Sequence, residues 1–156
     1  MTVDALAEFG LDRLSDDEVR DFLATQRMGV LGLDADDVPY LVPLSFGYDG
    51  DRTLYFTFVG GPESRKRTLI ETARRARFLT YAAQSPFNWE SVLLTGTVDE
   101  VPESDWDDLA AVFETAWRPA VVKEAGAAGD VSVVRFDVDE WTGIKHTGLP
   151  PGLDAE

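Results

Sequence analysis

The chain has 156 residues, 44% of them apolar and 28% charged, a composition typical of one globular domain spanning 1–156. It contains no cysteine and a single histidine, His146, which argues against disulfides, thiolate metal sites and a metal site built from several histidines. The net charge of −15 makes nucleic acid a poor partner. No stretch approaches the roughly 18 apolar residues of a membrane span, and the acidic N-terminus does not resemble a secretory signal, so we expect a cytoplasmic protein without membrane attachment.

The acidity of the chain favours adaptation to high salt. Acidic residues are spread over every segment, and only three of the 14 basic residues are lysines. High salt screens the self-repulsion of such a surface, so we favour an origin in a halophile. The alternative is an acidic surface that binds a basic partner.

Residue patterns predict helices and strands in a clear order. Ser15 and Glu18 form a capping box that starts a helix running to about Gln26. Alternating apolar residues between turn signals then predict six strands. These expected strands are 28–33, 38–48, 53–59, 78–83, 91–101 and 131–141.

Two further helices are expected between these strands. Ser64 caps a helix that begins at Arg65, after a Gly-rich loop. Apolar residues at helical spacing predict another helix from Pro102 to about Trp117. Residues 142–156 are expected to form a tail outside a core of about 15–141.

The connections between most strands are too short for helical crossovers. This favours a mainly β fold, an antiparallel sheet with about three peripheral helices. Closure of that sheet into a barrel would remove its exposed edges, so we predict a closed, six-stranded barrel in one domain.

A basic cluster gives the strongest functional signal. Six of the 14 basic residues lie between 65 and 77, and the first of them start a helix. Helix N-termini attract anions, so Ser64, Arg65 and Lys66 are a candidate phosphate site. The alternative is a solvated basic helix with a good cap.

Several other residues are candidates for a ligand site. The segments Pro43–Phe46 and Tyr55–Phe58 face each other across a hairpin and combine hydroxyls with aromatics, which suits the edge of a planar ring. The pattern alone favours the alternative, in which the aromatics are core and the hydroxyls face solvent. Trp89 could stack on a ligand or seal a subunit interface. His146 could protonate a substrate, but a histidine in a loose tail is more often solvated.

Taken in order, five segments of the chain resemble the flavin-binding split barrels of the pyridoxamine 5′-phosphate oxidase-like family. The resemblance is closest to the branch of nitroimidazole-resistance-type proteins and covers roughly residues 15–118. The segments that carry it are Met28–Gly32, Pro39–Phe46, Leu54–Thr57, Ser64–Lys66 and Glu90–Gly96.

This resemblance implies a six-stranded split barrel that forms a homodimer with one FMN at each of two interface sites. Arg65 and Lys66 would hold the phosphate, Ser91 would lie near the same site, and Trp89 would arrive from the other subunit. The isoalloxazine ring would be lined by Pro43, Leu44, Ser45, Phe46, Thr57 and Phe58.

The chain also departs from the family pattern. Ser64 stands where the family often has glycine, and the oxidase's arginine-bearing flavin motif and C-terminal substrate segment are missing. A true pyridoxamine phosphate oxidase is therefore not expected. Other members of the family use a deazaflavin coenzyme or haem. With one histidine in the chain, haem is the weaker of these two alternatives to FMN.

The leading hypothesis is an FMN-dependent oxidoreductase that reduces a small acceptor, with the flavin supplying the chemistry. The first alternative is a flavin carrier or sensor without turnover. The second is an acidic interaction module that binds no flavin.

Overall fold

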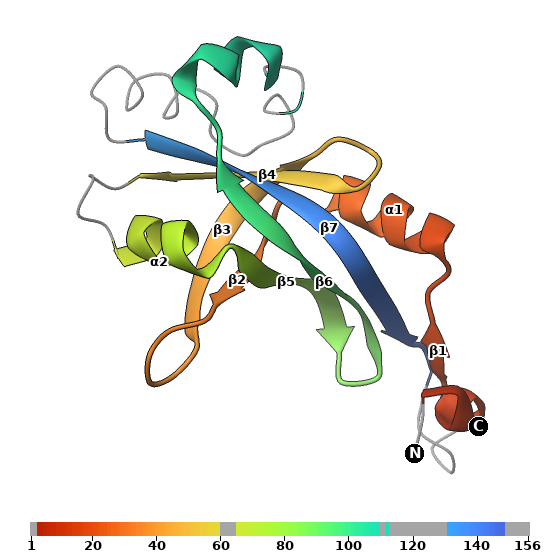
Figure 1. Ribbon diagram of the computed structural model, residues 1–156. Helices are drawn as coiled ribbons and strands as arrows, with labels where there is room; N and C mark the ends of the chain where they lie inside the picture. Colours follow the sequence, from red (N-terminus) through yellow and green to blue (C-terminus); the bar gives the residue numbers. More distant parts are fainter. Residues whose placement is uncertain (1–2, 60–64, 110–111, 113–130, 149–156) are drawn as a thin grey trace.

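A computed structural model describes residues 3–59, 65–109, 112 and 131–148 of the chain (Figure 1). The described part is mainly β, as the sequence predicts. Its elements are η1 (Val3–Phe9), β1 (Leu11–Arg13), α1 (Asp16–Thr25), β2 (Met28–Leu33), β3 (Tyr40–Tyr48), β4 (Thr53–Val59), α2 (Arg65–Ala73), β5 (Arg75–Ser85), β6 (Asn88–Glu100), η2 (Glu103–Leu109) and β7 (Val131–His146).

Six antiparallel strands close into a barrel in the order β7-β4-β3-β2-β5-β6. The last strand closes it, because β7 pairs with β4 along one edge and with β6 along the other. The predicted closed barrel is therefore confirmed. A seventh strand, β1, adds to the end of β7, and four helical segments are described where about three were expected.

The core fills the barrel with the inward residues of alternating strands. Phe46, Phe56, Phe78 and Phe136 are at most 1% exposed. Their ring centroids lie 4.8 to 5.7 Å apart along the chain of contacts from Phe46 to Phe136. Burial of each such side chain contributes about 1.5–3 kcal/mol to the free energy of unfolding.

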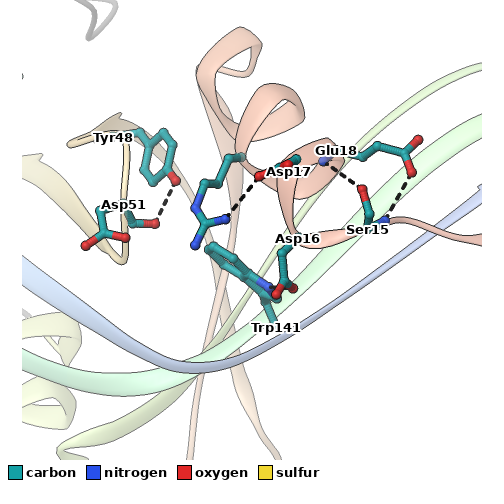
Figure 2. A network of polar contacts seen from close by, with 8 residues as sticks. Ser15, Asp16, Asp17, Glu18, Tyr48, Asp51 and Trp141 are labelled. Carbon is teal, nitrogen blue, oxygen red and sulfur yellow. Dashed lines mark hydrogen bonds and ion pairs between the residues drawn. The ribbon is translucent and has the colours of Figure 1, made fainter.

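Helix α1 covers one end of this core and is fixed by polar contacts at its own N-terminus (Figure 2). The predicted capping box is confirmed, since Ser15 accepts from the Glu18 amide and Glu18 accepts from the Ser15 amide. The indole Nε1 of Trp141 donates to Asp16 at 2.8 Å, and the guanidinium of Arg52 lies 3.9 Å from the centre of a Trp141 ring. These contacts join α1 to β7 and to the β3–β4 turn.

The β3–β4 hairpin turns at Asp49–Asp51, as predicted. The carboxylate of Asp49 accepts from the amides of Asp51 and Thr53 at 2.8 and 3.1 Å. Gly50 has a φ of 89°, a left-handed conformation that glycine adopts without strain.

Four expected segments differ from the structure. The last strand was expected to end at Trp141 but continues to His146, so residues 142–146 are not part of a tail. Strands β5 and β6 also extend further, because they form one long hairpin that turns between Ser85 and Asn88. The helix expected from Pro102 is a 3-10 helix up to Leu109. Most of its predicted remainder lies outside the described residues. None of the described helices is long and apolar enough to span a membrane.

Candidate functional site

The barrel wall is split between β3 and β4, because these strands pair over only part of their lengths. Among the described residues, their ladder ends at the pair Phe46↔Phe56. Beyond it, residues 40–45 pair with β2 on the other side, and residues 57–59 pair with β7. Figure 1 shows the two strands diverging from their common turn. The divergence leaves one edge of each strand open.

Pro43 lies on the open edge of β3, as its missing N–H predicts. The amide of Phe46 donates to the carbonyl of Arg27 at 3.0 Å, on the side of β2. Amides alternate along a strand, so the nitrogen of Pro43 and the N–H of Ser45 point toward the split instead. Among the described residues, no strand pairs with Ser45 on that side, so its N–H can bond a ligand.

The candidate ring-lining residues fall into two groups. Leu44 and Phe46 are 6% and 1% exposed and belong to the core. Pro43, Ser45 and Thr57 occupy the alternate positions and face outward beside the split. Only the second group presents side chains to a molecule on the outside of the barrel. Phe58 lies on β4 next to Thr57, and its side chain is outside the described residues.

The basic start of α2 lies at the same end of the barrel as the open stretch of β3. The guanidinium of Arg65 lies 5.5 Å from the ring centre of Tyr40, the first residue of β3. Lys66 follows in the first turn of α2, with its side chain outside the described residues, as is the whole of Ser64. The fold thus brings Arg65 of the predicted phosphate site next to β3, the strand that carries Pro43.

Much of the remaining basic cluster is already paired. Arg67 forms an ion pair with Glu100 at 3.0 Å, and Arg75 forms one with Asp139. Such pairs leave these cations less available to an external anion. Of this cluster, Arg65 is the residue that lies against Tyr40, beside the open stretch of β3.

Ser91 and Trp89 do not reach the split within one chain. Ser91 lies on β6, opposite Tyr81 of β5, and β5 and β2 separate β6 from β3. At about 4.8 Å per strand, Ser91 lies about 14 Å from the corresponding position on β3. Trp89 is further along β6, paired with His146, and its indole donates to the carbonyl of Pro86 at 3.1 Å.

The outer face of β3, β2, β5 and β6 is strongly apolar for a chain of net charge −15. Pro43, Val30, Leu79 and Leu93 form one continuous row of paired residues across this face. Around that row, Leu41, Tyr81 and Met28 are 66%, 60% and 50% exposed. We call it the outer apolar face. It comprises Met28, Val30, Gly32, Leu41, Pro43, Ser45, Arg77, Leu79, Tyr81, Ser91, Leu93 and Thr95.

Only one residue of the outer apolar face, Arg77, is charged. Exposed apolar patches of this kind mark interaction surfaces. The sequence interpretation did not identify this face, although the strand alternation that buries Val42, Leu44 and Phe46 leaves their neighbours outside. Tyr40 was also missed, because nothing in the sequence indicates that α2 begins beside it.

The arrangement defines a class of protein, the split β-barrel with a basic helix start beside its opening. Within that class the family is shown by the sequence itself. The family model described as pyridoxamine 5′-phosphate oxidase matches residues 15–145. The chain belongs to this family.

Solved structures share the fold at low sequence identity. An FAD-binding protein from Mesorhizobium loti is 20% identical with a TM-score of 0.71, over 88% of this chain and 98% of that chain. A putative 5-nitroimidazole antibiotic resistance protein from Bacteroides thetaiotaomicron is 19% identical with a TM-score of 0.67, over 87% and 89%. An FAD and haem binding protein from Mycobacterium smegmatis is 21% identical with a TM-score of 0.70, over 93% and 77%.

No curated protein matches the chain. In the described part of the chain, no group of three or more His, Cys, Asp or Glu side chains is placed to hold a metal ion.

Proposed function

We propose that the chain is a flavin-binding redox protein that holds FMN where β3 and β4 part. One observation carries the proposal: the unpaired edge at Pro43 and Ser45 lies on the same strand as Tyr40, over which Arg65 lies. A planar ring with polar edges needs backbone donors, and a terminal phosphate needs cations and helix amides. In this proposal, the open edge of β3 supplies the backbone donor for the ring, and the start of α2, beside the same strand, supplies the groups for the phosphate. Two neighbours with the same fold are described as FAD-binding, which supports a flavin cofactor in general.

In this proposal the residues of the chain bind and orient the flavin. The flavin itself supplies the redox chemistry and needs no protein acid or base to accept a hydride. Arg65, Lys66 and the first amides of α2 hold the phosphate. The N–H of Ser45 and the hydroxyl of Thr57 bond the ring edge, while Pro43 packs against it.

We further propose that the protein is a homodimer whose subunits meet on the outer apolar face. Leu41 and Tyr81 are more than half exposed, and their burial against a second copy would remove apolar area from water. The same contact explains how Ser91 and Trp89 take part in the site. They lie too far from the split of their own chain but face outward on β6, so the partner can bring them to the flavin.

The spectrum of the purified protein tests the proposal. We expect flavin absorption bands from the isolated protein, and heat release followed by chromatography identifies the bound molecule as FMN, FAD or a deazaflavin. A colourless protein that does not take up added FMN contradicts the proposal and favours the acidic interaction module. A Soret band would indicate haem instead.

Turnover separates an oxidoreductase from a carrier or sensor. We expect NAD(P)H to bleach the flavin bands and a small acceptor to restore them. A 5-nitroimidazole is a suitable first acceptor because a structural neighbour is described as a resistance protein for that class. Flavin that stays oxidised with NAD(P)H favours the carrier.

We also propose that the acidic surface is an adaptation to high salt. The Debye length falls from about 10 Å at 0.1 M to about 3 Å at 1 M salt, which weakens the repulsion within a chain of net charge −15. We expect the melting temperature to rise across a KCl series. A melting temperature that is flat or falls with salt would favour a basic protein partner.

A further inference from the structure

The N-terminal segment pairs with the end of β7. We call residues 3–13, which comprise η1 and β1, the N-terminal latch. Strand β1 pairs Leu11 with His146, and the amide of Thr147 donates to the carbonyl of Gly10 at 3.0 Å. Gly10 has a φ of 87°, and a Cβ there would lie 2.5 Å from the carbonyl oxygen of Thr147. The close approach of the latch therefore requires glycine at position 10.

His146, expected to be solvated in a tail, is instead buried under this latch. Its side chain is 9% exposed, and its Nε2 lies 3.1 Å from the carbonyl oxygen of Phe9. Its ring stacks against Trp89 with centroids 6.1 Å apart, and the ring of Phe87 lies 6.0 Å away. The imidazole is thus enclosed by two aromatic rings and the latch.

The contact with Phe9 fixes where the ring proton lies. A carbonyl oxygen only accepts, so Nε2 must carry the proton. In the neutral ring Nδ1 is then an unprotonated nitrogen, and it is buried without a hydrogen-bond partner in the described structure. A second proton would convert Nδ1 into a donor with no acceptor and place a charge between two apolar rings.

We propose that His146 makes the N-terminal latch pH-sensitive, so that protonation of its ring releases residues 3–13 from the end of β7. Imidazole is the side chain that changes charge between about pH 5 and 8. Contacts with the faces of Trp89 and Phe87 offset only part of the cost of burying the cation. Release lets the protonated ring reach water, which restores its missing hydrogen bond.

In the part of the chain that the structure describes, the charged groups around the latch do not supply that missing partner. Strand alternation places Asp12, Lys145 and Glu90, which are paired in register, on the opposite face from His146. On the face of His146, Arg13 is already bonded to Asp4 at 2.9 Å. Two other acids belong to elements packed nearby. They are Glu8 of η1, which is exposed, and Glu18 of α1, which bonds Lys145.

Release of the latch would change the surface beside the outer apolar face. Trp89 and His146 continue that face beyond Ser91, and the latch contacts His146 through Phe9 and Leu11. Without β1, the backbone of β7 at residues 144–146 becomes an open strand edge. The latch therefore controls the exposure of His146 and of this edge of β7, whether or not the protein binds flavin.

Amide hydrogen exchange of the full-length protein tests this inference. We expect protection of residues 3–13, corrected for intrinsic exchange, to fall at least about tenfold between pH 8 and pH 5, while amides of the β2–β5 ladder stay protected. In His146→Gln, the amide Nε2 can still donate to Phe9 but cannot gain a charge. Its protection should change less than about twofold over the same range. Equal loss in both proteins, or constant protection in the wild type, overturns the inference.

A second measurement covers the case in which His146→Gln loses the latch at every pH. His146 is the only histidine of the chain, so its imidazole gives a single assigned set of NMR signals. We expect the loss of latch protection in the wild type to follow the titration of this ring. Asp4→Asn serves as the matched control, and it should not shift the pH at which protection is lost. Protection that follows a carboxylate titration and shifts in Asp4→Asn contradicts the inference.

Discussion

The two ends of β3 lie beside two helices that differ in almost every respect. At the end near Tyr48, α1 is capped by Ser15 and held to β7 by the bond between Asp16 and Trp141 (Figure 2). At the other end, Tyr40 lies beside the basic start of α2, and β3 and β4 part from each other. At the α1 end the polar groups bond within the chain, while at the other end the described strands leave the N–H of Ser45 without a strand partner.

This difference indicates that the α1 end contributes to the stability of the fold and that the α2 end is available for ligand binding. The buried face of α1 comprises Val19, Phe22 and Leu23, each at most 7% exposed. Changes there should act on folding. Changes at the start of α2 should act on ligand binding, because an open edge and a cation beside it contribute little to the core.

The largest expected effect is on the α1 end. Phe22→Ala removes a buried aromatic ring and should lower the free energy of unfolding by about 3–5 kcal/mol, measured by urea denaturation. Phe22→Leu keeps most of the volume and should cost less. FMN affinity, measured where both variants are folded, should not change. A specific loss of affinity would show that the two ends are coupled.

The outer apolar face should decide the oligomeric state. Leu79→Asp places a carboxylate in the middle of the apolar row and should weaken association by about 3 kcal/mol or more, because it would be buried without a partner. Light scattering in high salt should give about twice the 17.2 kDa chain mass for the wild type and the monomer mass for the variant.

Ala24→Asp adds the same charge on the exposed side of α1 and serves as the control. It should remain dimeric. A monomeric wild type that still holds flavin would contradict an interface site.

At the α2 end, Lys66→Ala should weaken FMN binding by about 1.5–3 kcal/mol through the loss of a charge-assisted bond to the phosphate. Titration followed by flavin fluorescence measures this change. Riboflavin has no phosphate, so it should bind both proteins equally. Equal FMN affinity of wild type and variant would show that Lys66 does not bind the phosphate.

The smallest effect concerns the cap of α1 and depends on pH. The Ser15 amide, followed by Lys145, holds the pKa of Glu18 below its ordinary value of 4.5. A lowered pKa in the folded state means that the ionised carboxylate stabilises the protein above that value, and that this contribution disappears as the pH falls below it. Urea denaturation across pH 3 to 7 should therefore show a shallower acid dependence for Glu18→Gln. Parallel curves would contradict the effect.

Local signals in the sequence were sufficient for much of the fold. The capping box at Ser15 and the turn at Asp49 were predicted correctly, because each depends on residues close together in the chain. Strand β1 was missed, since three residues with no apolar alternation acquire their structure only by pairing with β7. His146 was misplaced for the same reason: its strand continues through Gly143 because β6 and β1 pair with it.

The site was predictable only in its parts. The basic corner and Pro43 could be identified from composition and from the missing N–H of proline. The separation of β3 and β4 beyond the pair Phe46↔Phe56 could not be predicted, since it depends on how far the two strands pair in three dimensions. The division of the ring-lining candidates, with Phe46 in the core and Ser45 outside, follows from the same strand geometry.

The closing role of β7 has a consequence for the order in which the barrel can form. β7 is the last of the described strands and the partner of both β4 and β6, so none of the described strands before it completes the ring. During synthesis, residues up to 130 can form only an open sheet whose edges are β4 and β6. The sequence separation of the β4–β7 pairs makes closure a slow step, and until it occurs both edges are free to pair with other chains.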